Sequence, residues 1–131
     1  MAPSNALDLS VGEVRQCAVI TLVGRLDHTT VDTFKTSIDE ALNSGAPLYK
    51  GVVIDLTKLS FMSSAGLRML LAARRTALEA GGRLCLIRPQ GAVQEVLDVS
   101  NLGGLFLVFE NTSDAVAALV DTSARRDAAA T

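Results

Sequence analysis

Apolar residues along the chain follow two spacings, and the change between them predicts the order of the elements. Apolar and polar residues alternate over residues 7–11, and a β-rich run follows over 17–23. Alternation is typical of half-buried strands, so these runs predict an antiparallel hairpin with its turn at Gly12-Glu13. Residues 24–30 are predicted to be a break, with Thr29 and Thr30 as caps of the next helix.

Apolar residues at helical spacing predict that this helix runs from residue 31 to about Asn43. The Val-Val-Ile run at 52–54 then predicts a buried strand, with Asp55 as a turn acceptor at its end. A long two-sided helix is predicted from about Ser64 to Ala80. Arg74 lies on its apolar side, where we expect the stem to follow apolar surface while the charge reaches water.

The last third of the chain repeats this change of spacing. It predicts a strand at Arg83–Ile87, a short helix around 92–99, a strand at 105–109 and a final helix from Ala115 to about Val120. Strands that alternate with helices are typical of an α/β fold whose sheet is parallel in its later part. One domain over residues 7–121 is expected, with flexible ends at 1–6 and 122–131.

Composition and charge restrict the classes of partner. The 131 residues are 49% hydrophobic with a net charge of −2, and no Lys or Arg cluster is interleaved with aromatic residues. Nucleic acid is therefore not an expected partner. No apolar run approaches the ~18 residues that span a bilayer, and the first residues lack the pattern of a secretory signal. Cys17 and Cys85 lie in strand-like apolar runs, which predicts reduced core cysteines in a cytoplasmic protein.

Two adjacent serines, Ser63 and Ser64, stand where the buried strand gives way to the long helix. A helix N-terminus has unpaired N–H groups and the positive end of the helix dipole, so it suits a phosphate. On the residues alone, these hydroxyls are either plain helix caps or a site of modification.

An enzyme is not favoured. A nucleophilic serine needs a base and an oxyanion hole, but the chain has no Gly-x-Ser-x-Gly sequence and its only histidine is His28, a predicted loop residue. There is also no Gly-x-x-x-x-Gly-Lys-Ser/Thr loop for a nucleotide. We therefore predict no catalytic residue, no cofactor and no metal site.

The residues around the serines resemble a known signature. Asp55-Leu56-Thr57-Lys58-Leu59-Ser60-Phe61-Met62-Ser63-Ser64-Ala65-Gly66-Leu67-Arg68, with Gly24-Arg25-Leu26-Asp27 and Thr30 upstream, is similar to the pattern of STAS domains, in particular the bacterial anti-sigma factor antagonists. The resemblance covers about residues 7–121. It implies a single α/β domain with a mixed, partly parallel sheet of about five strands packed with about four helices.

The resemblance also implies a partner-switching function. The unphosphorylated antagonist would bind an anti-sigma factor serine kinase of the histidine-kinase-like ATPase fold and so regulate sigma-factor-dependent transcription. Phosphorylation would separate the pair, and a metal-dependent serine phosphatase would reset the antagonist. Ser64 falls on the phosphoacceptor position; Ser63, where several members have Asp, is the alternative.

The expected partner-binding residues are Asp27, Thr30, Ser63, Ser64 and Arg68. Asp27 falls on an acidic position of the family next to the acceptor, where it would add like-charge repulsion. The alternative function is a non-catalytic STAS scaffold or accessory subunit, such as a stressosome-type, lipid-transport or nucleotide-sensing module. The short chain, which shows no sensor domain, favours the antagonist.

Overall fold

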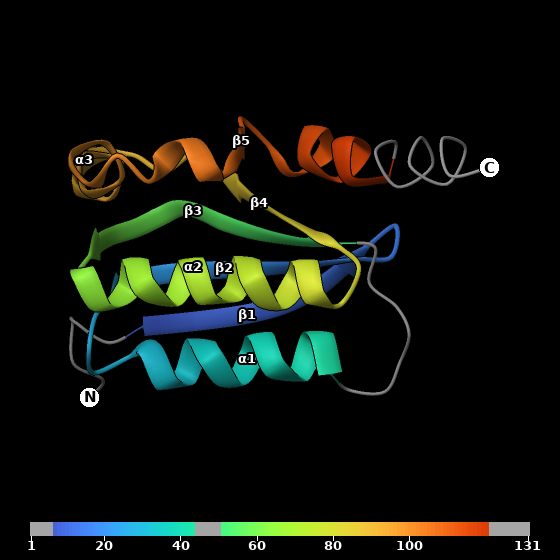
Figure 1. Ribbon diagram of the computed structural model, residues 1–131, viewed down its shortest axis with the longest axis horizontal. Coiled ribbons are helices and arrows are strands. Elements are labelled where there is room, and N and C mark those ends of the chain that lie inside the picture. The colour runs from blue at the N-terminus through green and yellow to red at the C-terminus, as the bar shows by residue number, and fades with distance from the viewer. Residues whose placement is uncertain (1–6, 44–50, 121–131) are drawn as a thin grey trace.

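A computed structural model describes residues 7–43 and 51–120, in which five strands and the helices between them form the α/β fold expected of a STAS domain (Figure 1). The strands are β1 (Leu7–Val14), β2 (Cys17–Leu26), β3 (Gly51–Met62), β4 (Arg83–Ile87) and β5 (Leu107–Phe109). The helices are α1 (Val31–Asn43), α2 (Ser64–Glu79), α3 (Gly91–Ser100) and a last helix over residues 112–120, with a 3-10 turn at Gly103–Leu105.

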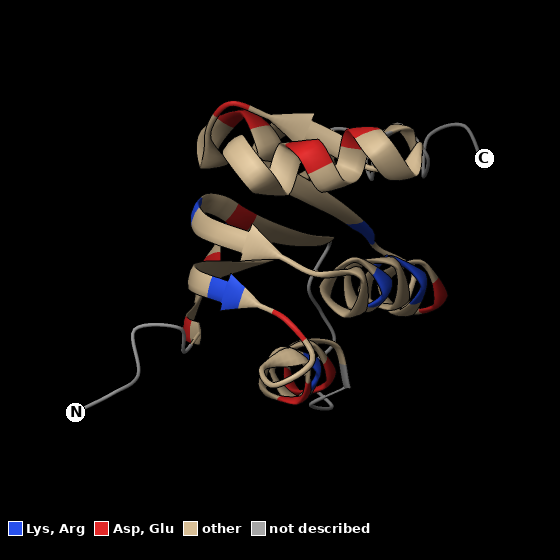
Figure 2. Cartoon of the chain, turned by 90° about the vertical axis from the view of Figure 1, so that its left-hand side faces the viewer, with Lys and Arg blue, Asp and Glu red and all other residues tan. Residues whose placement is uncertain are grey.

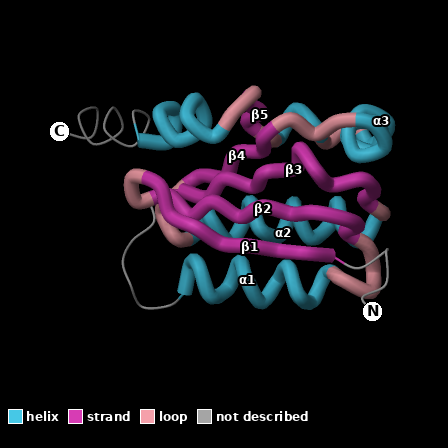
Figure 3. The backbone as a smooth tube through the Cα atoms, turned by 180° about the vertical axis from the view of Figure 1, so that it is seen from behind, coloured by secondary structure: helices cyan, strands magenta, loops and turns pink. Residues whose placement is uncertain are grey.

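The strands lie in the sheet in the order in which they occur in the chain, from β1 to β5. β1 and β2 form an antiparallel hairpin, whereas β2, β3, β4 and β5 pair in parallel (Figure 3). The mixed, partly parallel sheet that the sequence predicted is therefore confirmed. The hairpin turn is at Arg15-Gln16, not at Gly12-Glu13 as predicted, and both turn residues have positive φ angles of 49° and 67°.

Alternating side chains divide the buried residues between the two faces of the sheet. On one face, Ile20, Ile54 and Leu86 pack beneath α1, α2 and α3 in the larger core. On the other face, Val53 and Cys85 pack against the last helix in a smaller core. The parallel strands are thus covered on both sides, which explains their continuous apolar runs.

Two strands are longer than the sequence predicted. β2 continues through Arg25 and Leu26 instead of ending at residue 23, and β3 continues from the predicted 52–54 to Met62. The extra residues pair with each other, with Arg25 opposite Phe61 and Leu26 opposite Met62, after irregularities in the register. Asp55 is therefore inside β3, where its carboxylate accepts a hydrogen bond from the Thr57 N–H at 2.9 Å. Both strands therefore end next to the serine pair.

Smaller differences occur near the end of the domain. β5 begins at Leu107, because the predicted strand residues before it belong to the 3-10 turn and its exit. The last helix begins at residue 112 and not at Ala115, since Asn111 Oδ1 caps it by accepting from the Asp114 N–H at 2.8 Å. The predicted flexible ends at 1–6 and 122–131 lie outside the described residues. Within the described residues, no helix is long and apolar enough to cross a membrane.

Candidate functional site

The two predicted site segments meet where β2 and β3 end. Leu26 and Met62 are paired across these parallel strands, and the Ser63 N–H donates to the Leu26 carbonyl oxygen at 3.0 Å. Asp27 and Ser63 are the next residues along each chain segment, so they lie side by side at the carboxyl edge of the sheet. We call this region the serine corner: Asp27, Thr30, Ser63 and Ser64.

Gly66 lets the first turn of α2 approach the end of β2. A Cβ at this position would lie 2.5 Å from the Leu26 carbonyl oxygen and 2.9 Å from Met62 Cγ. The oxygen is backbone and cannot rotate away, so any side chain here would displace the helix from the strand end. The glycine of the Ser-Ser-Ala-Gly sequence is therefore explained by close packing that sets the position of both serines.

The two serines have different roles in the helix. Ser63 is the N-cap of α2, with extended backbone, and its Oγ accepts a hydrogen bond from the Gly66 N–H at 3.3 Å. Ser64 is the first helical residue and is exposed, and its hydroxyl makes no hydrogen bond within the described part of the chain. The Ser63 hydroxyl thus caps the helix, while the Ser64 hydroxyl is accessible at the surface.

Asp27 is held in a turn that leads into α1. Its Oδ1 accepts hydrogen bonds from the Thr29 N–H at 2.9 Å and the Thr29 hydroxyl at 2.6 Å. These bonds lower the pKa of the Asp27 carboxyl below its ordinary value, with smaller contributions from the charges of His28 and Arg25, while burial acts in the opposite direction. The Asp27 carboxylate is therefore a fixed negative charge of the serine corner.

The Thr30 side chain stabilises the same turn by hydrogen bonds. Its hydroxyl accepts from the Asp27 N–H at 2.9 Å and donates to the Arg25 carbonyl oxygen at 3.0 Å. Thr30 is buried, with 8% of its surface exposed. It therefore holds the turn in shape, and the partner contact expected of it stays a prediction.

Arg25 and Phe61 border the serine corner, and the sequence predicted a role for neither. Arg25 Nε lies 3.6 Å from Asp27 Oδ2, and the guanidinium carbon lies 4.1 Å from the centre of the Phe61 ring. The two residues face each other because they are paired across β2 and β3. Arg25 partly offsets the charge of Asp27, so the like-charge repulsion expected from Asp27 alone is reduced.

A mostly apolar groove opens beside Ser64, between the start of α2 and one side of α3. It measures about 400 Å³ and is lined by Ser64 and Leu67 of α2 and by Ala92, Glu95, Val96 and Val99 of α3. We call it the α2–α3 groove. The sequence contained a signal for it: Ala92, Val96 and Val99 recur at helical spacing beside the buried Val93 and Leu97, and one buried stripe does not account for both sets.

The arginines of α2 have separate positions. Arg68 is exposed one helical turn beyond Ser64. Arg74 does not simply extend into water, because its Nε donates to the Leu105 carbonyl oxygen at 2.9 Å. Arg68 is therefore the arginine of α2 that borders the serine corner, and Arg74 connects the helix to the 3-10 turn.

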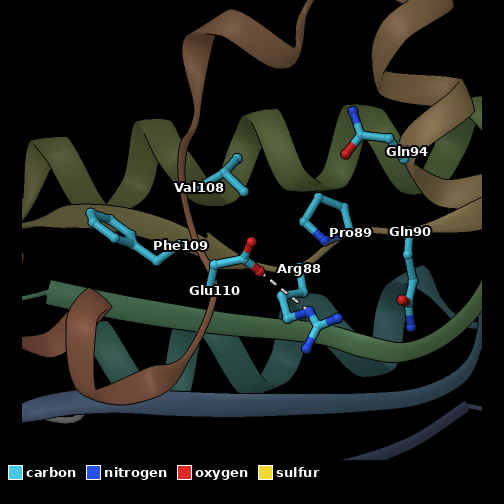
Figure 4. A pocket seen from close by; sticks show the side chains of 7 residues that line it. All are labelled: Arg88, Pro89, Gln90, Gln94, Val108, Phe109 and Glu110. Atoms are coloured by element: carbon cyan, nitrogen blue, oxygen red, sulfur yellow. Dashed lines mark ion pairs between the residues drawn. The ribbon is translucent and has the colours of Figure 1, made fainter.

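A second hollow, of about 310 Å³, lies where β4 and β5 end (Figure 4). Arg88 points across it to Glu110, with 3.4 Å between Nε and Oε2, and the Gln90 amide donates to the Thr57 carbonyl oxygen at 2.6 Å. These polar groups already bind one another or the backbone, so they connect strand ends. Among the described residues, no three His, Cys, Asp or Glu side chains gather as a metal site.

Comparisons with known proteins agree with this geometry. The STAS domain model matches residues 8–115. The chain is 27% identical over 113 residues to an anti-sigma F factor antagonist of Paenibacillus polymyxa, covering 86% of this chain and 95% of that protein. It is 33% identical over 89 residues to one of Lysinibacillus sphaericus, covering 68% and 74%.

Among solved structures, the Bacillus cell fate determinant SpoIIAA in its phosphorylated form is 26% identical with a TM-score of 0.66, covering 86% of this chain and 99% of that chain. The unphosphorylated form of the anti-sigma factor antagonist SpoIIAA gives 25% and 0.65, covering 87% and 98%. The family model spans most of the chain, and sequence relatives and fold agree with it. The chain therefore belongs to the STAS domain family, among the anti-sigma factor antagonists.

Proposed function

We propose that this protein binds an anti-sigma factor serine kinase of the histidine-kinase-like ATPase fold and is released when that kinase phosphorylates Ser64. Binding would free a sigma factor for transcription, and a serine phosphatase would return the antagonist to its binding form. The protein would act by association and not by catalysis. The observation that carries this proposal is the exposed Ser64 hydroxyl at the first position of α2.

Ser64 is favoured over Ser63 by their hydrogen bonds. A kinase needs access to a hydroxyl that can be turned toward its nucleotide, and Ser64 is exposed at the mouth of the α2–α3 groove. Phosphorylation of the half-buried Ser63 would alter the capping oxygen that accepts the Gly66 N–H and would require a bulky dianion at a half-buried position. Modification of Ser64 leaves that cap in place.

The helix N-terminus tolerates the phosphate while the complex does not. A phosphoserine carries a charge of about −1.5 to −2, which the dipole of α2 favours by about 0.3–1 kcal/mol. The same charge enclosed in a protein interface without a partner costs several kcal/mol. Each loss of about 1.4 kcal/mol lowers affinity tenfold, so the modification would end binding without unfolding the domain.

The test uses the tagged full-length chain purified from its own cell under conditions that preserve phosphate. We expect tandem mass spectrometry to place one phosphate on Ser64, and we expect an ATPase of the histidine-kinase-like fold to co-purify with wild type and Ser64→Ala. Ser64→Glu should lose that partner, while Ser63→Ala should still be phosphorylated.

Equal recovery of the partner with Ser64→Ala and Ser64→Glu would contradict the switch. Co-purification with a transporter ATPase instead of a kinase would favour the alternative function as an accessory subunit. A phosphate found only on Ser63 would move the acceptor by one residue and overturn the argument from capping.

A further inference from the structure

We propose that the α2–α3 groove takes an apolar side chain of the partner protein that is accompanied by a basic group. The inference rests on the proposed function, because it names the surface next to Ser64 at which the partner is held. It goes further in stating the chemistry of the segment that docks there.

Residues of α3 form most of the apolar surface of the groove. Val99 has 80% of its surface exposed, the largest fraction among the exposed large hydrophobic residues that the structure describes. It lies on one stripe with Ala92 and Val96, and Leu67 of α2 faces them across the groove. Aliphatic side chains on both walls match an aliphatic or aromatic side chain inserted between the two helices.

The acidic charge on α3 favours a basic group in the partner segment. Of the described residues that line the groove, Glu95 alone is charged. The helix α3 that forms one wall carries Glu95 and Asp98 but no Lys or Arg. Figure 2 shows red but no blue on the helices in its upper part, of which α3 lines the groove. A partner segment with Lys or Arg beside its apolar anchor complements this surface.

The position of Ser64 then explains how one phosphate controls a whole docking surface. Ser64 is at the rim of the groove, so a phosphate there places a charge of about −1.5 to −2 where the apolar anchor enters. A hydrated dianion at the mouth of an apolar groove must lose water when an apolar side chain fills the groove. The phosphate therefore acts on the anchor directly, even where it touches no acidic group of the partner.

The experiment selects random peptides of about twelve residues, displayed on phage, against the purified, unphosphorylated full-length chain. We expect the selected peptides to share an aliphatic or aromatic residue with Lys or Arg close to it. A selected peptide should bind Val99→Lys at least tenfold more weakly, because the substitution removes apolar surface and adds a like charge. Glu95→Gln should weaken binding several-fold and reduce its dependence on salt.

Val11→Lys is the matched control. Val11 is also an exposed valine, with 49% of its surface accessible, but it lies on the edge strand β1. The peptide should bind this variant as tightly as wild type. Binding that is lost equally in Val99→Lys and Val11→Lys, or selection of peptides without basic residues, would overturn the proposal.

Ser64→Glu separates this inference from the proposed function. If the peptide depends on Val99 but binds Ser64→Glu as tightly as wild type, the groove docks such segments and control by Ser64 is wrong. If the natural kinase responds to Ser64 but binds Val99→Lys normally, the switch holds and the groove is not its docking surface.

Discussion

Ser63 and Ser64 are adjacent in sequence but differ in what surrounds their hydroxyls. The Ser63 hydroxyl accepts a hydrogen bond from the Gly66 N–H at the start of α2, whereas Ser64 is exposed and lines the α2–α3 groove. This difference follows from the helix boundary, because the N-cap residue has extended backbone and the next residue is already helical. The sequence predicted the boundary correctly but left open which serine was the cap.

Ser63→Ala should lower the free energy of unfolding by about 0.5–2 kcal/mol, since it removes a helix N-cap. Ser64→Ala should change it by no more than about 0.5 kcal/mol, because an exposed hydroxyl without protein partners is lost. Urea unfolding followed by circular dichroism measures both values. Equal losses for the two variants would mean that the capping assignment is wrong.

Asp27 makes the stability of the domain depend on pH. Its pKa is lowered in the folded state, so its stabilising contribution is present above the unfolded value of about 3.9 and is lost as the pH falls through the folded value. The wild-type protein should lose stability below about pH 4, in part because Asp27 becomes protonated. Asp27→Asn should lack that part of the loss. Urea midpoints at pH 7 and pH 3 test this, with the exposed Asp8→Asn as control.

β2, β3 and α2 together build the serine corner. The predicted strands ended too early because Asp55 and Gly24 are typical of turns, and a turn was the local interpretation of both. In the structure each is accommodated inside a strand: Gly24 has a φ of 112°, and its carbonyl oxygen accepts from the Ser60 hydroxyl at 2.8 Å. Pairing between the strands therefore outweighs the local preference and carries both strands to the corner.

Gly66→Ala tests the contact between α2 and β2. The added methyl group overlaps the Leu26 carbonyl oxygen, and overpacking of this kind costs about 1–3 kcal/mol of stability. We expect that loss in urea unfolding, together with weaker binding of the partner because the serines move. Gly12→Ala is the control, since a Cβ there meets nothing within 4 Å. An unchanged stability of Gly66→Ala would contradict the close approach.

The domain as a whole separates its stability from its proposed switch. Its larger core is formed by the sheet beneath α1, α2 and α3, and its smaller core lies beneath the last helix, while Ser64 lies outside both. A charge added at Ser64 therefore lies at the exposed surface and not inside either core. The same charge has a large effect only where a partner covers it.

Ser64→Glu should therefore leave the thermal midpoint unchanged or slightly higher, because a negative charge is favoured at the first turn of α2. It should also lower affinity for the anti-sigma factor at least tenfold. Differential scanning calorimetry and isothermal titration calorimetry measure the two effects on one preparation. A lower midpoint together with lower affinity would indicate damage to the fold in place of a switch.

Most elements and their order followed from neighbouring residues, because helical and strand spacing are local patterns that burial imposes on a few turns of chain. The fold class, α1, α2 and the parallel later strands were all predicted in this way. The groove side of α3 was also encoded locally, as a second apolar stripe.

Contacts between segments far apart in the chain were accessible only in the folded molecule. The contact of Arg25 with Phe61 and the packing of Gly66 on Leu26 depend on the register of β2 against β3. The same register brings the Ser60 hydroxyl to the carbonyl oxygen of Gly24, 36 residues earlier. Spacing within one segment contains no information about that pairing, so the serines could be located from the chain, but their surroundings could not.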